Sequence, residues 1–136
     1  NLKKQARPIF NSARLKGYNM IPIINFGEYT VCADTFNEDD ISMRKHFIKE
    51  CGWSEREYRK IQNFEWFRVE VSLWKDGKEL QTEYLGACCY KTRAEFWTEC
   101  RADYFADMVN DCAASTKDAN LTAQVGKWRD SLRVTA

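Results

Sequence analysis

The chain has 136 residues, 44% of them hydrophobic, and a formal net charge of +1, which is typical of one folded domain with a buried core. Two prolines and six glycines are too few for a disordered chain, and no apolar run approaches the roughly 18 residues of a membrane span. The basic, weakly apolar start is not typical of a signal peptide. We therefore expect a single cytoplasmic domain over residues 1–136, without membrane contact.

The N-terminal part of the chain predicts a helix followed by one or two strands. Residues 2–16 are expected to be helical, with Pro8 limiting the run and Gly17 ending it. Residues 20–33 are rich in strand-forming side chains, and Gly27 inside them marks a bulge or a tight turn. The segment is therefore either one bent strand or two short ones.

Two shorter helices are expected next. Short polar residues precede residues 41–51, whose apolar side chains recur on one side of a helix that Gly52 would end. Ser54 and Glu57 have the spacing of a capping box, in which each side chain accepts a hydrogen bond from the backbone of the other residue. A short helix is expected from there.

The clearest predicted element is a β-hairpin over residues 64–90. Both of its arms carry strand patterns, and Asp76-Gly77 between them suits a two-residue type I′ turn. Pairing through that turn predicts a register with these opposite residues: Leu73 and Leu80, Val71 and Thr82, Glu70 and Glu83, Val69 and Tyr84. Phe67, Val69, Val71 and Leu73 would then form one apolar face.

Two helices complete the prediction. A capping box from Thr92 to Glu95 would open a long helix to about residue 114, and residues 115–118 have the same form before a last helix. The core stripe of the long helix is expected to contain these residues: Trp97, Tyr104, Phe105, Met108, Val109 and Cys112. The fold class is α+β: a small antiparallel sheet, made of hairpin 64–90 and one or two strands in 20–33, packed with four to five amphipathic helices.

The most unusual feature of the long helix is a row of acids at every fourth position: Glu95, Glu99, Asp103, Asp107 and Asp111. In one regular helix they would form a slanted ridge about 24 Å long. Their repulsion would cost roughly 1–2 kcal/mol if no cation offsets it, and Arg101, the one cation inside the helix, is expected to point toward the core. We interpret the ridge as a binding surface for a basic protein partner; the alternative is a solvated face relieved by neighbouring cations.

A second charge segregation lies at the N-terminus. Residues 1–27 contain five cations and no acid, so they carry +5 and the remainder carries −4. The five cations are Lys3, Lys4, Arg7, Arg14 and Lys16. Such an arm can bind nucleic-acid phosphates, or it can dock on the acidic ridge of its own domain.

The cysteines and the single histidine favour neither metal binding nor catalysis. The six cysteines are Cys32, Cys51, Cys88, Cys89, Cys100 and Cys112, and no CxxC motif occurs among them. Most are expected to be buried, reduced thiols, without a disulfide framework, a zinc site or a cofactor. His46 has no nucleophile at a sharp turn nearby in the sequence, and no P-loop or nucleophile elbow is present.

The sequence therefore favours binding over enzymatic activity. The preferred hypothesis is a non-enzymatic macromolecule-binding protein, an inhibitor that engages a basic surface of a nucleic-acid-handling complex through the acidic ridge. The compact chain, rich in Trp and Cys, is similar in style to accessory proteins of phages and mobile elements. The first alternative is nucleic-acid binding through the basic arm, and the second is a carboxylate- or metal-dependent hydrolase around Glu70 and Glu83.

Overall fold

The computed structural model describes residues 23–135, and in them the chain forms a four-stranded antiparallel sheet with helices. The strands lie in the order of the sequence: β1 (Ile23–Phe26), β2 (Tyr29–Asn37), β3 (Glu65–Lys75) and β4 (Lys78–Tyr90). The helical elements are η1 (Lys45–Glu50), α2 (Glu55–Arg59), α3 (Arg93–Glu99), η2 (Arg101–Phe105), α4 (Ala106–Ser115) and α5 (Ala119–Thr135). This arrangement confirms the α+β class. The helix predicted at residues 2–16 lies outside the described residues.

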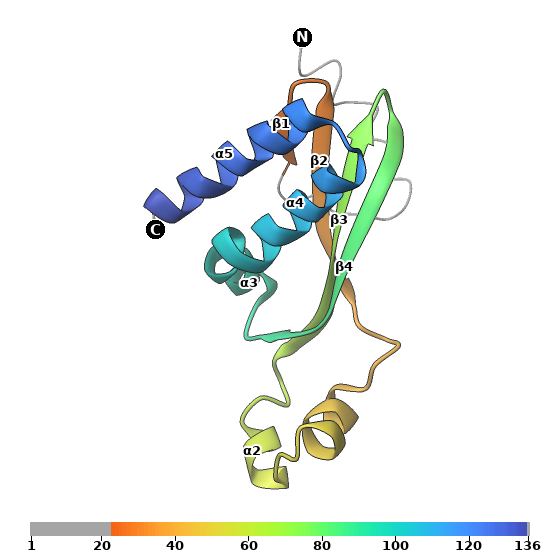
Figure 1. Ribbon diagram of the computed structural model, residues 1–136. Coiled ribbons are helices and arrows are strands. Elements are labelled where there is room, and N and C mark those ends of the chain that lie inside the picture. The colour runs from red at the N-terminus through yellow and green to blue at the C-terminus, as the bar shows by residue number, and fades with distance from the viewer. Residues whose placement is uncertain (1–22, 136) are drawn as a thin grey trace.

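The helices α3, α4 and α5 cover one face of the sheet, and η1 with α2 lies beyond one end of it (Figure 1). The core lies between the sheet and the three helices. From the sheet it contains the predicted apolar face of β3, and from the helices mainly Phe96, Phe105, Val109, Leu121 and Val125. Each of these five helix side chains is at most 1% exposed, so they hold the two layers together by apolar burial.

Two tight turns fix the order of the strands. The described part of the predicted segment 20–33 belongs to two strands rather than one, because Gly27 with φ +60° turns the chain between β1 and β2. Asp76 and Gly77 both have positive φ, 53° and 74°, as a type I′ turn requires, which confirms the predicted hairpin between β3 and β4.

The predicted register of β3 and β4 is wrong beyond the turn. Trp74 pairs with Glu79 as expected, but Leu73 pairs with Gln81, so Leu80 is an extra residue in β4. This bulge moves all later pairs by one residue, and a second irregularity follows opposite Arg68. Glu70 therefore lies opposite Tyr84, and Glu83 lies opposite Val71.

The face of the sheet away from the helices is also buried at its centre. Glu70, Ser72 and Trp74 of β3 are at most 7% exposed, and so are Cys32 and Asp34 of β2. Glu70 lies directly across from Asp34, and its carboxylate accepts a hydrogen bond of 3.1 Å from Arg68 Nε. The middle of β3 is therefore buried on both faces of the sheet.

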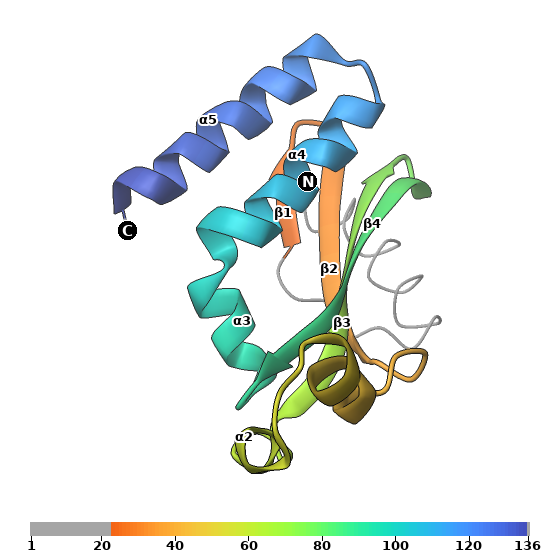
Figure 2. The same cartoon turned by 60° about the horizontal axis from the view of Figure 1, so that its bottom comes forward.

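The predicted long helix is interrupted. It ends at Glu99, passes through the five-residue π-turn η2, in which Phe105 N–H donates to Cys100 C=O (3.0 Å), and continues as α4 (Figure 2). The wider turn changes which residues face the core, because its hydrogen bond spans five residues where that of an α-turn spans four. Tyr104, placed in the core stripe by the sequence, is 56% exposed, whereas Phe96 is fully buried. Arg101 is also exposed, not directed toward the core.

Of the three predicted capping boxes, one forms as predicted. Ser54 and Glu57 form both hydrogen bonds of the capping box. The Thr92 side chain makes no capping bond; the carboxylate of Glu65 on β3 accepts from the Arg93 N–H instead (2.5 Å). At the start of α5 the cap is Asp118.

Candidate functional site

The five acids of the predicted ridge lie on α3, η2 and α4. Glu99, Asp103, Asp107 and Asp111 are exposed, and Glu95 is half-buried. Because η2 interrupts the helix, the five side chains do not line up along one straight ridge. They form an acidic face along two helical segments, and we use the term acidic face for these five residues.

One cation from a neighbouring helix reaches the acidic face. Arg129 on α5 forms an ion pair with Asp107, while the other four acids form no ion pair with any residue in 23–135. Two more arginines border the face at a depression of about 690 Å³, where Arg101 and Arg133 line the wall together with Glu99 and Asp103. Most of the carboxylates thus remain solvated, and the repulsion between them is only partly offset.

An exposed aromatic side chain lies beside these acids. Tyr104 follows Asp103 in η2, and its exposure of 56% is a consequence of the π-turn. It also lines a second depression, of about 370 Å³, between the end of β4 and η1. Tyrosine is enriched at protein interfaces, so an exposed tyrosine next to the acidic face is a candidate contact residue.

The five cations of the predicted basic arm, Lys3, Lys4, Arg7, Arg14 and Lys16, all lie outside the described residues. Their binding to nucleic acid stays a prediction, and so does their docking on the acidic face.

The predicted carboxylate pair of Glu70 and Glu83 does not form. Residues directly opposite each other point to the same face of a sheet, so Glu83 points with Val71 toward the helices, whereas Glu70 points away from them. The bulge at Leu80 is the physical cause. Within residues 23–135, no group of three or more His, Cys, Asp or Glu side chains has the geometry to hold a metal ion.

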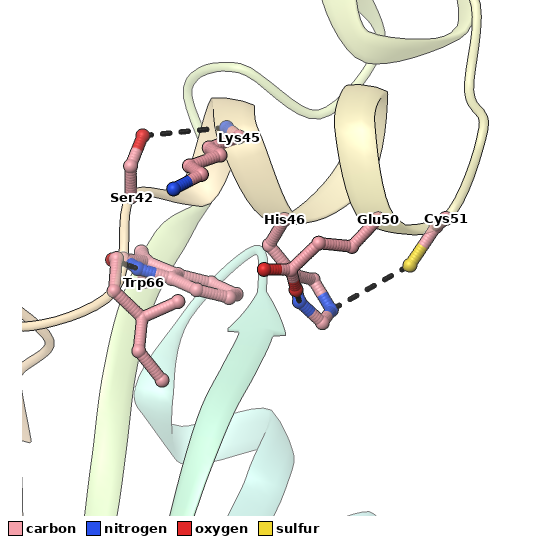
Figure 3. A network of polar contacts seen from close by, with 7 residues as sticks. Ser42, Lys45, His46, Glu50, Cys51 and Trp66 are labelled. Carbon is pink, nitrogen blue, oxygen red and sulfur yellow. Dashed lines mark hydrogen bonds and ion pairs between the residues drawn. The ribbon is translucent and has the colours of Figure 1, made fainter.

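The structure brings together three residues that the sequence analysis did not connect: His46, Glu50 and Cys51. Figure 3 shows the His46 ring between the Glu50 carboxylate and the Cys51 thiol. His46 Nδ1 lies 3.1 Å from Glu50 Oε2, and His46 Nε2 lies 3.7 Å from Cys51 Sγ. We call these three residues the thiol–imidazole cluster.

A π-turn builds this cluster. Cys51 N–H donates to His46 C=O over five residues (2.9 Å), and Trp53 N–H donates to Phe47 C=O (2.8 Å) across Gly52 with φ +75°. In a regular α-helix, residues five apart lie about 140° apart around the axis, so His46 and Cys51 would point in different directions. The i,i+4 spacing of His46 and Glu50 was visible in the sequence, but the π-turn that brings in Cys51 has no sequence signature.

Aromatic side chains fix the position of the imidazole. The His46 ring lies 5.5 Å from the Trp66 ring and 5.1 Å from the Phe47 ring, measured between centroids. Trp66 lies on β3, and its indole N–H donates to Ile41 C=O (2.7 Å), which holds it against the start of η1. The cluster therefore rests on the sheet.

The other cysteines are less accessible than Cys51. All six lie in the described part of the chain and are free, but Cys51 alone is exposed; Cys89 is half-buried and the remaining four are buried. Burial raises the pKa of Cys32, of Cys88 and of Cys112 to about 12, and it also raises the pKa of Cys89. Cys100 lies 3.1 Å from the hydroxyl of Tyr90.

Among residues 23–135, no helix combines the length and the apolar character that a membrane span needs. No protein-family model, curated protein or solved structure matches this chain.

Proposed function

We propose that this chain is a non-enzymatic binding protein whose acidic face engages a basic surface of a protein partner. The single observation that carries the proposal is that four of the five acids are exposed, and only Asp107 is paired with a cation among the described residues. A helix surface that keeps unpaired like charges bears a repulsion that a partner with Lys and Arg side chains would relieve.

The partner class follows from this charge. A groove that normally holds nucleic acid is lined with Lys and Arg, so it is complementary to a row of carboxylates. Occupation of such a groove would inhibit the nucleic-acid-handling complex that contains it, a role that suits an accessory protein of a phage or mobile element. Tyr104 would supply an aromatic contact next to the charged ones.

The six free thiols support a site of action in the reducing cytoplasm, because a reducing environment keeps cysteines unpaired.

The test is a charge reversal that leaves the fold intact. Asp103→Lys with Asp111→Lys changes two exposed carboxylates that have no ion pair to a described residue, whereas reversal of Asp107 would also break its contact with Arg129. Asp39→Lys with Asp40→Lys is the matched control, since both of these acids are exposed and lie between β2 and η1, away from the acidic face.

We expect the wild type and the control to retain the same partner from a nuclease-treated bacterial lysate, and the Asp103/Asp111 variant to lose it. With the purified partner, the reversal should weaken affinity by at least about tenfold, and wild-type binding should weaken steeply with salt. Equal binding by the two double variants would refute the acidic face as the interface.

A further inference from the structure

The thiol–imidazole cluster has the parts of an activated thiol. Cys51 is exposed, His46 Nε2 faces its sulfur at 3.7 Å, and Glu50 faces the other ring nitrogen at 3.1 Å. A carboxylate at Nδ1 accepts the Nδ1–H, so the neutral ring carries its proton there and keeps a lone pair on Nε2 for the thiol proton. This is the order of nucleophile, base and orienting group that thiol chemistry needs.

Cys51 is the C-terminal cap of η1, and its backbone N–H donates to His46 C=O, which fixes the thiol beside the imidazole. This geometry makes His46 the base that can take the thiol proton. The π-turn that aligns the two residues is a feature that occurs frequently at functional sites.

The surroundings of the cluster indicate the class of reactant. Lys45 and Lys49 are exposed on the same helical turn, and each forms no ion pair with a described residue. The imidazole also lines the depression of about 370 Å³ next to Phe47 and Tyr104, which leaves space beside the base. Positive charge on the helical turn that carries the base, together with free space beside the imidazole, suits a small anionic reactant.

We propose that Cys51 is a reactive thiol that forms mixed disulfides with anionic low-molecular-weight disulfides such as glutathione disulfide, with His46 as its general base and Glu50 as a positioning residue. The Cys51 S–H proton moves to His46 Nε2, and the sulfur attacks one sulfur of the reactant. A bond between the two sulfurs forms, the original disulfide bond breaks, and the leaving thiolate takes a proton from the imidazolium. Cys51 is oxidised and the released thiol is reduced, so no further oxidant is needed.

The first test locates the modification in the full-length protein. Native protein is incubated with glutathione disulfide, quenched with acid, and the mixed disulfide is mapped by mass spectrometry. We expect Cys51 to be modified first, Cys51→Ser to prevent it, and Cys89→Ser to leave it unchanged. Modification of Cys89 or of a buried cysteine before Cys51 would overturn the proposal.

The second test measures the role of His46. The rate is followed with an anionic aromatic disulfide whose released thiolate absorbs visible light. Without a base, only a few per cent of a thiol is ionised near neutral pH, so removal of the base lowers the reactive fraction. A thiolate of higher basicity attacks somewhat faster, which offsets part of this loss. We therefore expect His46→Gln to lower the rate about tenfold. Added imidazole should restore the rate of His46→Ala, which a purely structural role of His46 would not allow. A wild-type rate in His46→Gln would refute the base.

Substitutions at exposed positions can change the reactivity of Cys51 without disturbing the fold. Glu50→Gln keeps an oxygen that accepts the Nδ1–H and should react close to the wild-type rate, whereas Glu50→Ala should be slower. Lys45→Gln with Lys49→Gln should slow the anionic disulfide but not cystamine, a cationic one. Equal rates for Glu50→Ala and the wild type would remove Glu50 from the proposal, and equal slowing of both disulfides would remove the charge argument.

Discussion

At the scale of single residues, Asp118 links two parts of the fold through one carboxylate. Its Oδ1 accepts from the backbone N–H of Asn120 (3.0 Å) and of Leu121 (3.2 Å), and its Oδ2 accepts from the Tyr29 hydroxyl (2.9 Å). These hydrogen bonds, that from the Leu121 N–H above all, hold the pKa of Asp118 below its ordinary value of 3.8. The ionised carboxylate therefore caps α5 and ties it to β2.

A depressed pKa in the folded state makes this contribution dependent on pH. The stabilisation is fully present above the unfolded-state pKa, and it is lost as the pH falls through the lower folded-state pKa. We expect Asp118→Asn to lower the melting temperature at neutral pH, and the difference from the wild type to shrink once the pH falls below about 3.8. Thermal unfolding followed by circular dichroism across this range measures the difference.

Asp39→Asn is the control for this experiment, because Asp39 is exposed and forms no hydrogen bond to a side chain or backbone group in residues 23–135. It should melt with the wild type at every pH. A melting-temperature gap for Asp118→Asn that stays constant into strong acid would contradict the role assigned to the charge.

At the scale of secondary-structure elements, η2 decides which side chains of the interrupted helix are buried. Phe105 is fully buried and packs against Trp97 and Trp128, at centroid distances of 5.5 and 5.9 Å, whereas its neighbour Tyr104 is 56% exposed. Both residues belong to the core stripe that the sequence predicts for an uninterrupted helix. The structure separates them.

This separation predicts opposite effects on stability. Phe105→Ala should lower the free energy of unfolding by about 3–5 kcal/mol, because it leaves a cavity between Trp97 and Trp128 in the core. Tyr104→Ala should change it by no more than about 0.5 kcal/mol, as is usual for an exposed position. Urea denaturation of the two variants gives both values. Similar losses in both variants would mean that the helix is continuous and that η2 does not form.

The elements also show where sequence reasoning succeeds and where it fails. The turns at Gly27 and at Asp76-Gly77 were predictable, because positive φ has a strong residue preference. The apolar face of β3 was predictable because side chains alternate along a strand. The bulge at Leu80 and the positive φ of Ala87 were not, since neither residue carries a signal for an inserted position.

The candidate sites divide in the same way. Exposed acids are visible in a sequence because most carboxylates stay at the surface, with Asp34 and Glu70 among the exceptions here, and four of the five acids of the acidic face are exposed. The thiol–imidazole cluster was not visible, because it depends on a backbone hydrogen bond over five residues between Cys51 and His46. The same kind of turn, in η2, changed the geometry of the acidic face. The sequence analysis missed the thiol–imidazole cluster and the bend of the acidic face for the same reason: a π-turn in a helix has no recognisable sequence signature.

At the scale of the whole molecule, charge is divided along the chain. Residues 1–27 carry +5 and the remaining residues carry −4, so a net charge of +1 conceals two segments of opposite sign. Nucleic-acid binding through the basic arm and protein binding through the acidic face therefore place function in different parts of the chain. The two hypotheses make different predictions about salt and about which charges matter.

The basic-arm hypothesis predicts that the full chain binds short duplex DNA at low salt. If all five arm cations contact phosphates, the logarithm of the affinity should fall with the logarithm of the salt concentration with a slope of about −4.5.

Replacing the five arm cations by Gln should remove this binding, whereas the same replacement at five exposed cations of the η1 and α2 region should not. The control set is Lys45, Lys49, Arg56, Arg59 and Lys60. Fluorescence anisotropy gives the affinities and the slope. A full chain that fails to bind DNA at low salt would exclude the arm as a nucleic-acid site, while the protein interface proposed for the acidic face would be unaffected.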